Sequence, residues 1–469
     1  MFDGAYVSWR SWQKFPIVTS LALIMIALLT YGYLWRSGPV MAGDSGGYIS
    51  VAQDISSMSM LRPQHRTPGM PLLIAITGLP PGRSFVWAQL LLHGIATVCG
   101  LFLLRACGMQ ALPILGFALL MWTPLYVQSS RIVMTETVAE AALLLTIGTW
   151  WLAVKKTKWW AAILSGFLAC YAALSRPSYQ LLPFILAILT VLASGLFIES
   201  SNKRAKFRRN SLLLLFAGTL PMLVISYINH ARFGYFGLTY ALGAHICNRT
   251  VLFVERLGVQ WEPLRTALIE ARNRALIEGK SHTALQFQWD HWRELRERTG
   301  LDDVRLSQKL FKANVELIRQ NPLEYLIAVL RAVASQTMPY VTKVAGVDAV
   351  RHSLWVLLHF LGLGAWVLQL WAVGGTFVYL AATKGIGRVF ERGTCCSAEC
   401  VALYMVVFAV IVYTVLVNAA FDVGDPRQRS PVDMLMWLQT FLGFSLMQRW
   451  IRAGSEGGPV AGRDGLIQP

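Results

Sequence analysis

The sequence predicts an all-α polytopic membrane protein. Of its 469 residues, 55% are hydrophobic and only 14% are charged, a composition that excludes a soluble globule of this size. About ten apolar runs approach or reach the length needed to cross a hydrocarbon core of ~30 Å at ~1.5 Å per helical residue. We therefore expect about ten transmembrane helices, with amphipathic helices in the loops on the outer face.

The expected membrane helices follow these runs in chain order, because a continuous apolar stretch of this length is typical of a helix buried in lipid. They cover residues 16–35, 85–105, 111–128, 134–154, 159–174, 178–198, 211–229, 353–381, 400–420 and 432–449. The first run is too long for a cleavable signal, and no small-residue cleavage pattern follows it. It is expected to remain as a membrane helix.

The distribution of basic residues sets the orientation, because Lys and Arg in short loops favour the cytoplasmic side. With the N-terminus inside, the basic segments 155–158 and 203–209 fall inside, as do the basic residues of the later loops, Lys384, Arg388, Arg392, Arg449 and Arg452. The outer face then carries residues 36–84, turns near Arg131 and Arg176, the long segment 232–352 and residues 422–431.

Four parts are expected along the chain. They are an N-terminal transmembrane module, 1–230, with the first outer loop at 36–84; an extracytoplasmic, partly helical segment, 231–352; C-terminal transmembrane helices, 353–450; and a disordered tail, 451–469. Charge-rich stretches in the second part are typical of the exposed faces of amphipathic helices. Pro322 opens a further helix, which we expect to lie along the membrane surface.

The charge and cysteine content exclude some classes of function. The net charge of +17 is largely spread over short cytoplasmic loops, so membrane topology explains it and nucleic-acid binding is not expected. The seven cysteines give no outer disulfide framework. Cys395, Cys396 and Cys400 are compatible with a thiol metal site, but no fourth ligand has the usual spacing, and reduced cytoplasmic thiols are ordinary.

Five polar clusters fall on the outer face, where a charged residue at the membrane boundary is a functional candidate. A carboxylate beside several guanidinium groups suits removal of a proton from an acceptor and binding of a departing phosphate. The clusters are Asp44 with Tyr48; Arg62 with His65 and Arg66; Glu136 with Glu140; Arg176; and residues 425–429, which include Arg427 and Arg429.

The same residues carry a family resemblance. The chain contains, in order, Gly-Asp-Ser-Gly-Gly-Tyr from residue 43, Arg-Thr-Pro-Gly-Met-Pro from 66, Thr-Glu-Thr from 135, Ser-Arg-Pro from 175 and Gly-Asp-Pro-Arg-Gln-Arg-Ser-Pro from 424. This order resembles the GT-C membrane glycosyltransferases, and most of all the bacterial branch related to protein O-mannosyltransferases and lipid A aminoarabinose transferases. The similarity runs from about Phe15 to Arg449.

The resemblance implies transfer of a sugar, with inversion, from a polyprenyl-phosphate carrier to a lipid, glycan or protein acceptor. The location implied is the bacterial inner (cytoplasmic) membrane, with the active site facing the periplasm or cell exterior. Asp44 would be the general base or would orient the acceptor, with Glu136 as a second carboxylate. Tyr48 would pack the first loop and contact the sugar; the residues that would hold the phosphate or sugar are Arg66, Arg176, Arg427 and Arg429.

One departure from the family pattern bears on metal dependence. Many relatives follow the first-loop acid with a second acid, whereas Ser45 stands here. We therefore expect no cofactor, and a divalent ion, although not excluded, is not favoured.

Structural explanations remain open for each candidate. Asp44 and Thr135 suit helix N-caps, and Glu136 suits a first helical turn; Glu140 suits a pair with Arg131. Arg176 suits a side chain that extends to the headgroups, His65 a structural histidine, and residues 425–431 a rigid loop with an internal ion pair.

Three other functions compete with sugar transfer: a transporter or flippase of lipid-linked sugars, an O-antigen ligase or polymerase, and a structural or assembly role. A transporter is expected to carry charges near helix centres. The central parts of these apolar runs are almost free of charged residues, apart from His93 near the middle of the second run.

Overall fold

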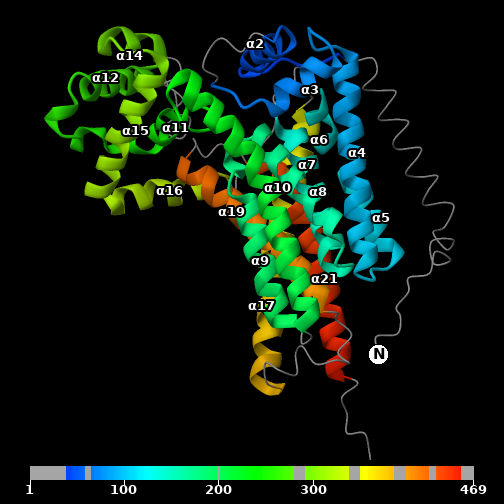
Figure 1. Ribbon diagram of the computed structural model, residues 1–469. Coiled ribbons are helices and arrows are strands. Elements are labelled where there is room, and N and C mark those ends of the chain that lie inside the picture. Colours follow the sequence, from blue (N-terminus) through cyan, green and yellow to red (C-terminus); the bar gives the residue numbers. More distant parts are fainter. Residues whose placement is uncertain are drawn as a thin grey trace, which may run out of the picture.

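The computed structural model describes residues 38–58, 65–197, 201–278, 291–336, 349–384, 398–421 and 429–455. These residues are helical apart from turns and short connections, and their one β-type pairing is a parallel bridge between Val40 and Ile132 (Figure 1). The expected first membrane helix, 16–35, and most of the expected tail, 451–469, lie outside the described residues.

The first half of the chain contains helices α2 to α10. Their bounds are α2 Ser45–Ser56, α3 Gly69–Thr77, α4 Arg83–Ala106, α5 Ala111–Met121, α6 Pro124–Val127, η2 Gln128–Arg131, α7 Glu136–Lys155, α8 Trp159–Ser175, η3 Pro177–Tyr179, α9 Leu182–Phe197 and α10 Ser201–Phe233.

The second half contains the remaining helices. They are α11 Leu242–Thr250, η4 Val251–Arg256, η5 Val259–Trp261, α12 Leu264–Ile277, α14 Trp292–Thr299, α15 Asp303–Gln320, α16 Pro322–Gln336, α17 Ala349–Lys384, α19 Ala398–Phe421, η7 Ser430–Val432 and α21 Asp433–Ser455.

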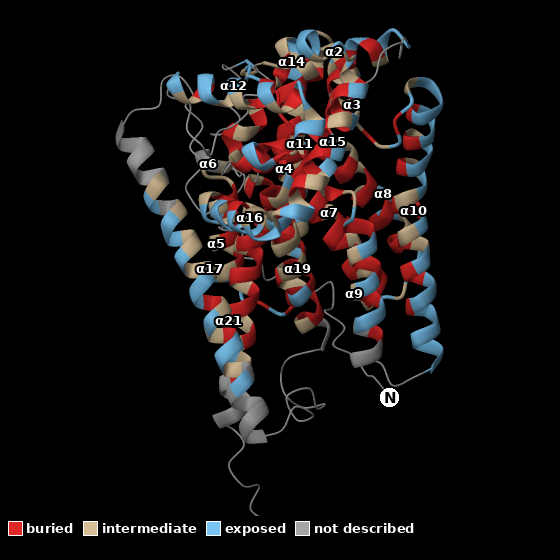
Figure 2. Ribbon diagram, turned by 90° about the vertical axis from the view of Figure 1, so that its left-hand side faces the viewer, coloured by how far each residue is buried: buried red, intermediate tan, exposed pale blue. Residues whose placement is uncertain are grey.

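A long helical bundle forms the body of the molecule. Helix α7 packs against α4 and α8, α10 packs against α8 and α9, and α21 packs against α17 and α19. The core includes Trp150 and Trp151 of α7, both fully buried. Exposed positions along the outer helices are often apolar, as in α10 and α17 (Figure 2), which suits a bundle whose outer surface faces lipid.

Four described helices are long and apolar enough to cross a membrane. They are Arg83–Ala106, Glu136–Lys155, Ser201–Phe233 and Cys400–Phe421, and three shorter apolar helices accompany them, Ala111–Met121, Trp159–Ser175 and Pro177–Leu192. The helical membrane architecture is as expected from the sequence. The number of ten transmembrane helices is not confirmed.

The expected continuous helix at 111–128 is wrong. Helix α5 ends at Met121, and the short segments α6 and η2 follow. Pro124 disfavours helical backbone at the residue before it, and the Thr123 hydroxyl donates to the Leu120 carbonyl at 2.7 Å, which helps to close the last turn of α5.

Helices α11 to α15 form a separate lobe beside one end of the bundle, which we name the outer lobe (Figure 1). As the charge pattern predicts, its helices are amphipathic: α15 buries Leu306, Leu310 and Leu317 within a core of its own. Helix α11 crosses α15 closely at Gly243, where an added Cβ would lie 1.9 Å from the Ser307 carbonyl oxygen.

Helix α16 joins the outer lobe to the bundle. It begins at Pro322 as expected, and the Tyr325 hydroxyl donates to the Ala420 carbonyl of α19 at 2.7 Å. Leu323, Leu326 and Leu330 are exposed and share one face by their spacing. That a membrane surface covers this face stays a prediction.

We predict that Gly243→Ala destabilises the protein by about 1–3 kcal/mol, the usual cost of overpacking, because its Cβ would meet backbone atoms of α15. Thermal unfolding in detergent measures the effect. Gly364→Ala is the matched control, because no atom lies within 4 Å of the added Cβ in α17. Equal unfolding midpoints for the two variants would contradict the close crossing of α11 and α15.

Candidate active site

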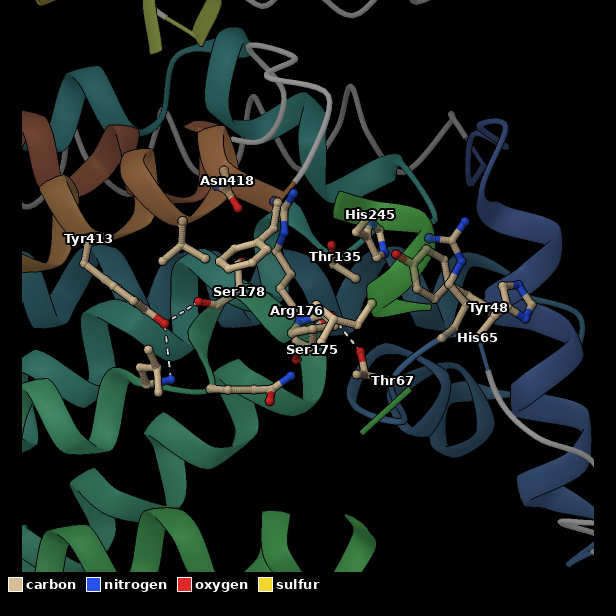
Figure 3. A pocket seen from close by; sticks show the side chains of 17 residues that line it. Tyr48, His65, Thr67, Thr135, Ser175, Arg176, Ser178, His245, Tyr413 and Asn418 are labelled. Carbon is tan, nitrogen blue, oxygen red and sulfur yellow. Dashed lines mark hydrogen bonds between the residues drawn. The ribbon is translucent and has the colours of Figure 1, made fainter. Parts of the chain in front are cut away.

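A cavity of about 270 Å³ opens where the first outer loop, the start of α9, α11 and α19 meet. Figure 3 shows Tyr48, His65 and His245 at one end of this cavity, Tyr413 and Asn418 at the other, and Arg176 between them. Arg66, Thr67, Thr135 and Ser175 also line it. Residues from five separate parts of the chain therefore share one pocket.

The first outer loop is anchored to the segment before α7. The Val40 amide donates to the Arg131 carbonyl at 2.8 Å, and the Val133 amide donates to the Val40 carbonyl at 3.0 Å. Ser45 is fully buried and donates to the Val133 carbonyl at 2.9 Å, while it accepts from the Ala42 amide at 2.8 Å. Ser45, the residue directly after Asp44, thus holds the loop in place.

Asp44 forms an ion pair with Arg66 at the edge of the cavity. Nη2 of Arg66 lies 2.6 Å from Oδ1 of Asp44, and both side chains are about one-quarter exposed. The Arg66 guanidinium also lies over the Tyr48 ring, 5.1 Å from its centroid. Asp44 precedes α2, but its side chain makes no capping bond there. The structural explanation of Asp44 as a helix N-cap is therefore not supported.

Gly47 makes this arrangement sterically possible. A Cβ added to Gly47 would lie 2.9 Å from Nε2 of His65 and 3.3 Å from Nε of Arg66. The glycine therefore lets α2 approach the loop that carries both residues.

The loop after Arg66 is fixed to the end of α8. The Thr67 hydroxyl donates to the Ser175 carbonyl at 3.2 Å, and the Tyr171 hydroxyl donates to the Gly69 carbonyl at 3.3 Å. A Cβ on Gly69 would lie 2.7 Å from the Leu174 carbonyl group. These contacts hold the Arg66 loop beside Arg176, the next residue after α8.

Arg176 is only 7% exposed and lines the cavity at the break between α8 and η3. The Tyr413 hydroxyl of α19 donates to the Ser178 carbonyl and accepts from the Leu181 amide at 3.2 Å. It thereby satisfies backbone groups at the break. The Arg176 side chain is directed into the protein, unlike that of an arginine that snorkels to the headgroups.

Electrostatics differ between the two ring side chains near the ion pair. Burial raises the pKa of Tyr48 above its ordinary value, although the nearby Arg66 charge opposes the shift. Burial, together with the Arg66 charge, lowers the pKa of His65 to about 4, while Asp44 and Asp303 oppose that shift. At neutral pH, His65 is thus an uncharged hydrogen-bonding group of the cavity.

The two glutamates of α7 have different surroundings. Glu136 is 8% exposed and lies in the first turn of α7, directly after the cavity residue Thr135. Glu140 lies deeper, where Oε2 is 3.8 Å from Nδ1 of His93. The expected pairing of Glu140 with Arg131 is wrong, because the Arg131 guanidinium donates to the Gly38 carbonyl instead.

Arg429 does not line the cavity. It is 2% exposed, and its Nε lies 2.8 Å from Oδ1 of Asp433. It also donates to the Gln336 carbonyl and lies 3.2 Å from Nδ1 of His359. These contacts join α16, α17 and α21. Arg62, Asp425 and Arg427 lie outside the described residues.

Sequence reasoning missed the contributions of α11 and α19. His245 and Leu242 come from α11, and Tyr413, Asn418 and Phe421 from α19. The α19 residues belong to an apolar run, and nothing in the sequence places α11 against the first loop. His245 lies in none of the motifs that the sequence analysis used.

Metal-binding groups do not gather at the described site. Over the described ranges, no three His, Cys, Asp or Glu side chains lie close enough to share a metal ion. Cys395 and Cys396 lie outside those ranges, and Cys400 is buried in α19.

No protein-family model matches the chain, and no curated protein sequence matches it. Among solved structures it is similar to the archaeal oligosaccharyltransferase AglB from Archaeoglobus fulgidus, in complex with an inhibitory peptide and a dolichol-phosphate, over 98% of this chain and 53% of that one, with 14% identity and a TM-score of 0.47. It is also similar to the Archaeoglobus fulgidus oligosaccharyltransferase tethered to an acceptor peptide. That similarity covers 93% of this chain and 50% of the other, with 14% identity and a TM-score of 0.47.

This chain thus spans about half the length of those proteins. Both are oligosaccharyltransferases.

We predict that Ser45→Ala loosens the first loop, because it removes the bond to Val133 and leaves a buried carbonyl without that donor. The expected loss of stability is about 1–3 kcal/mol. Hydrogen exchange measures it locally, and the amides of residues 40–48 are expected to exchange faster. Ser57→Ala is the control, because Ser57 is exposed and its hydroxyl donates to the Gln53 and Asp54 carbonyls at the end of α2, away from Val133. Unchanged exchange in the first loop would contradict the anchoring role.

The lowered pKa of His65 predicts a pH dependence of stability. Its pKa lies below the ordinary value of 6.5 in the folded protein, so the unfolded chain binds a proton first. The free energy of unfolding therefore falls as pH drops from 6.5 through about 4.

We expect His65→Gln to lose less stability than the wild type over this window, as measured by thermal unfolding at stepped pH. His230→Gln, at an exposed position at the end of α10, is the control and is expected to follow the wild type. If His65→Gln also follows the wild type, the burial of His65 is refuted.

Proposed function

We propose that this protein is an integral membrane glycosyltransferase that transfers a sugar from a polyprenyl-phosphate donor to a hydroxyl acceptor, with inversion. The observation that carries the proposal is the composition of the cavity. An acid–arginine pair and a buried arginine line or border its polar part, and exposed apolar side chains border its opening. A phosphate joined to a long apolar chain matches both.

Arg66 and Arg176 are the proposed phosphate ligands. Arginine suits a phosphate because its guanidinium presents several donors in a fixed plane. Arg66 uses one of five N–H groups for Asp44, so further donors can reach a phosphate while the ion pair persists. The partly buried setting strengthens such charge-assisted bonds relative to open water.

The apolar side chains at the cavity suit the polyprenyl chain. Leu181 directly before α9, Leu242 of α11 and Phe421 of α19 line the cavity and are 55%, 48% and 40% exposed. They come from three different parts of the chain and together form an exposed apolar surface at the cavity. A lipid chain could lie against them while the phosphate remains with the arginines.

Asp44 is the proposed general base. The acceptor hydroxyl oxygen attacks the anomeric carbon, the bond from that carbon to the phosphate oxygen breaks, and the hydroxyl proton passes to the Asp44 carboxylate. Polyprenyl phosphate leaves with the bonding electron pair, and one displacement inverts the anomeric carbon. Arg66 bonds Asp44 directly, so it orients the base and lies close to the charge that develops on the phosphate.

The remaining candidates have supporting roles in this proposal. Tyr48 holds Arg66 through its ring and faces the cavity, where it can contact the sugar. Glu136 contributes negative charge near Tyr48 and is the second carboxylate. Arg427 stays an expected phosphate ligand, whereas Arg429 supports the C-terminal helices through Asp433.

The proposed setting is a bacterial inner membrane, with the cavity on the extracytoplasmic face and a lipid, glycan or protein as acceptor. Asp44 and Ser45 offer one carboxylate where many members of the family that the motifs resemble have two, so the proposed mechanism uses no metal.

We predict that Asp44→Asn lowers sugar transfer by about 10²- to 10⁴-fold, the usual contribution of a general base. Purified protein in liposomes is given a panel of polyprenyl-phosphate sugars, and released polyprenyl phosphate is measured. Glu297→Gln is the control, because Glu297 is an exposed carboxylate of the outer lobe. It is expected to keep wild-type turnover.

Donor binding, measured separately on the same variants, distinguishes the roles. Asp44→Asn is expected to bind the donor, whereas Arg176→Gln is expected to bind it at least tenfold more weakly. Full turnover by Asp44→Asn would remove this residue from the mechanism. Movement of intact lipid-linked sugar across the liposome membrane, without transfer, would support a flippase instead.

A further inference from the structure

The end of the bundle opposite the cavity carries a basic helical extension. Helix α10 begins at Ser201, ten residues before the apolar run expected at 211–229. We name residues 201–210 the basic extension. Its five cationic side chains are all exposed: Lys203, Arg204, Lys206, Arg208 and Arg209.

Two side chains hold the basic extension against the bundle. Phe207 is 6% exposed and belongs to the bundle core. Asn210 is 2% exposed, and its Nδ2 donates to the Ala153 carbonyl of α7 at 3.1 Å. Lys156 and Lys158 follow shortly after Ala153 and are exposed. Two basic segments of the sequence are therefore fixed side by side.

Exposed indoles place the basic extension at the membrane boundary. Trp159 and Trp160 open α8 and are 54% and 46% exposed. Tryptophan favours the level of the lipid headgroups. These two residues directly follow Lys158, so indole and cationic side chains meet at one level of the bundle.

The packing of α8 on α10 fixes that level. An added Cβ at Gly166 would lie 2.4 Å from the Leu214 carbonyl oxygen and 2.9 Å from the Gly218 nitrogen. Cys170, one turn further along α8, lies beside the backbone of Met222, so the two helices run parallel. Gly166 of α8 is level with residues 214–218 of α10. Because the helices run parallel with the same rise per residue, Trp159, seven residues before Gly166, is level with residues 207–211.

The extension is longer than the headgroup layer is thick. Ten helical residues extend ~15 Å, and the polar layer on each side of a bilayer is roughly 5–8 Å thick. If Trp159 lies at the headgroup level, Arg208 and Arg209, which are level with it, lie there too, and Lys203 and Arg204 lie beyond the layer, within reach of it through their long side chains.

We propose that the basic extension, together with Lys156 and Lys158, is a binding surface for the headgroups of anionic phospholipids in the leaflet at this end of the bundle. Clusters of four to eight basic residues directly beside a membrane helix attract such lipids, and the helical form presents the charges on a fixed frame. The inference does not depend on the proposed sugar transfer.

The test uses the full chain in detergent and native mass spectrometry. The probe is an equal mixture of phosphatidylglycerol and phosphatidylcholine. The wild type is expected to retain phosphatidylglycerol at least tenfold more than phosphatidylcholine, and this preference is expected to fall as salt increases.

The variant for this test replaces the five basic residues of the extension by Gln: Lys203→Gln, Arg204→Gln, Lys206→Gln, Arg208→Gln and Arg209→Gln. It is expected to lose most of the preference. The matched control removes five positive charges from the outer lobe and is expected to keep it: Arg293→Gln, Arg305→Gln, Lys309→Gln, Lys312→Gln and Arg319→Gln.

Two further measurements keep the outcome decisive. Lys203→Arg with Lys206→Arg preserves the charge and is expected to preserve the preference, which separates lipid binding from effects on folding. Inorganic phosphate at the same concentration as the lipid is expected not to displace it. Equal retention of both lipids by the wild type, equal losses in the two five-site variants, or displacement by inorganic phosphate would overturn the proposal.

Discussion

The pairing of Asp44 with Arg66 is the interaction on which the arrangement of the cavity depends. It joins the start of α2 to the loop before α3, and that loop is in turn fixed to the end of α8 through Thr67. An ion pair that is one-quarter exposed contributes little stability by itself. Its importance is geometric, because it keeps a carboxylate and a guanidinium side by side at the edge of a cavity.

Close approaches of α2 to the Arg66 loop, and of that loop to the end of α8, hold this pair in place. Gly47 and Gly69 leave room for side chains and backbone that a Cβ would displace, and Ser45 ties the loop to the residues before α7. The motif residues around Asp44 therefore have separate physical tasks. Some place the charged groups, and others allow the helices that carry them to come together. A cavity built in this way has its polar groups positioned before any ligand binds, which favours electrostatic catalysis.

Much of the fold could be predicted from the sequence, because long apolar runs have few alternatives to a membrane helix. Helices α4, α7, α8 and α19 begin and end within about two residues of the runs expected for them. The break after α5 was missed although Pro124 signals it, since hydrophobicity alone does not distinguish one helix from two short ones. The helical start of α10 was missed because a charged segment carries no apolar periodicity.

The site was predictable only in part, because the sequence shows polar residues beside apolar runs but not how the helices pack. Asp44, Tyr48, Arg66 and Arg176 stood out as polar residues at the ends of apolar runs, and the structure brings them to one cavity or its edge. Arg429 stood out equally, yet Asp433 one turn later binds it. His245 and Asn418 reach the cavity only through the packing of α11 and α19, which no local pattern reports.

The most direct test of the central claim is an experimental structure with a non-hydrolysable polyprenyl-phosphate sugar bound. The account predicts the phosphate within hydrogen-bond distance of the Arg66 and Arg176 guanidinium groups, the anomeric carbon facing Asp44, and the lipid chain against Leu181, Leu242 and Phe421. A phosphate bound elsewhere, for example beside Arg429 and His359, with the cavity left to solvent, would contradict it.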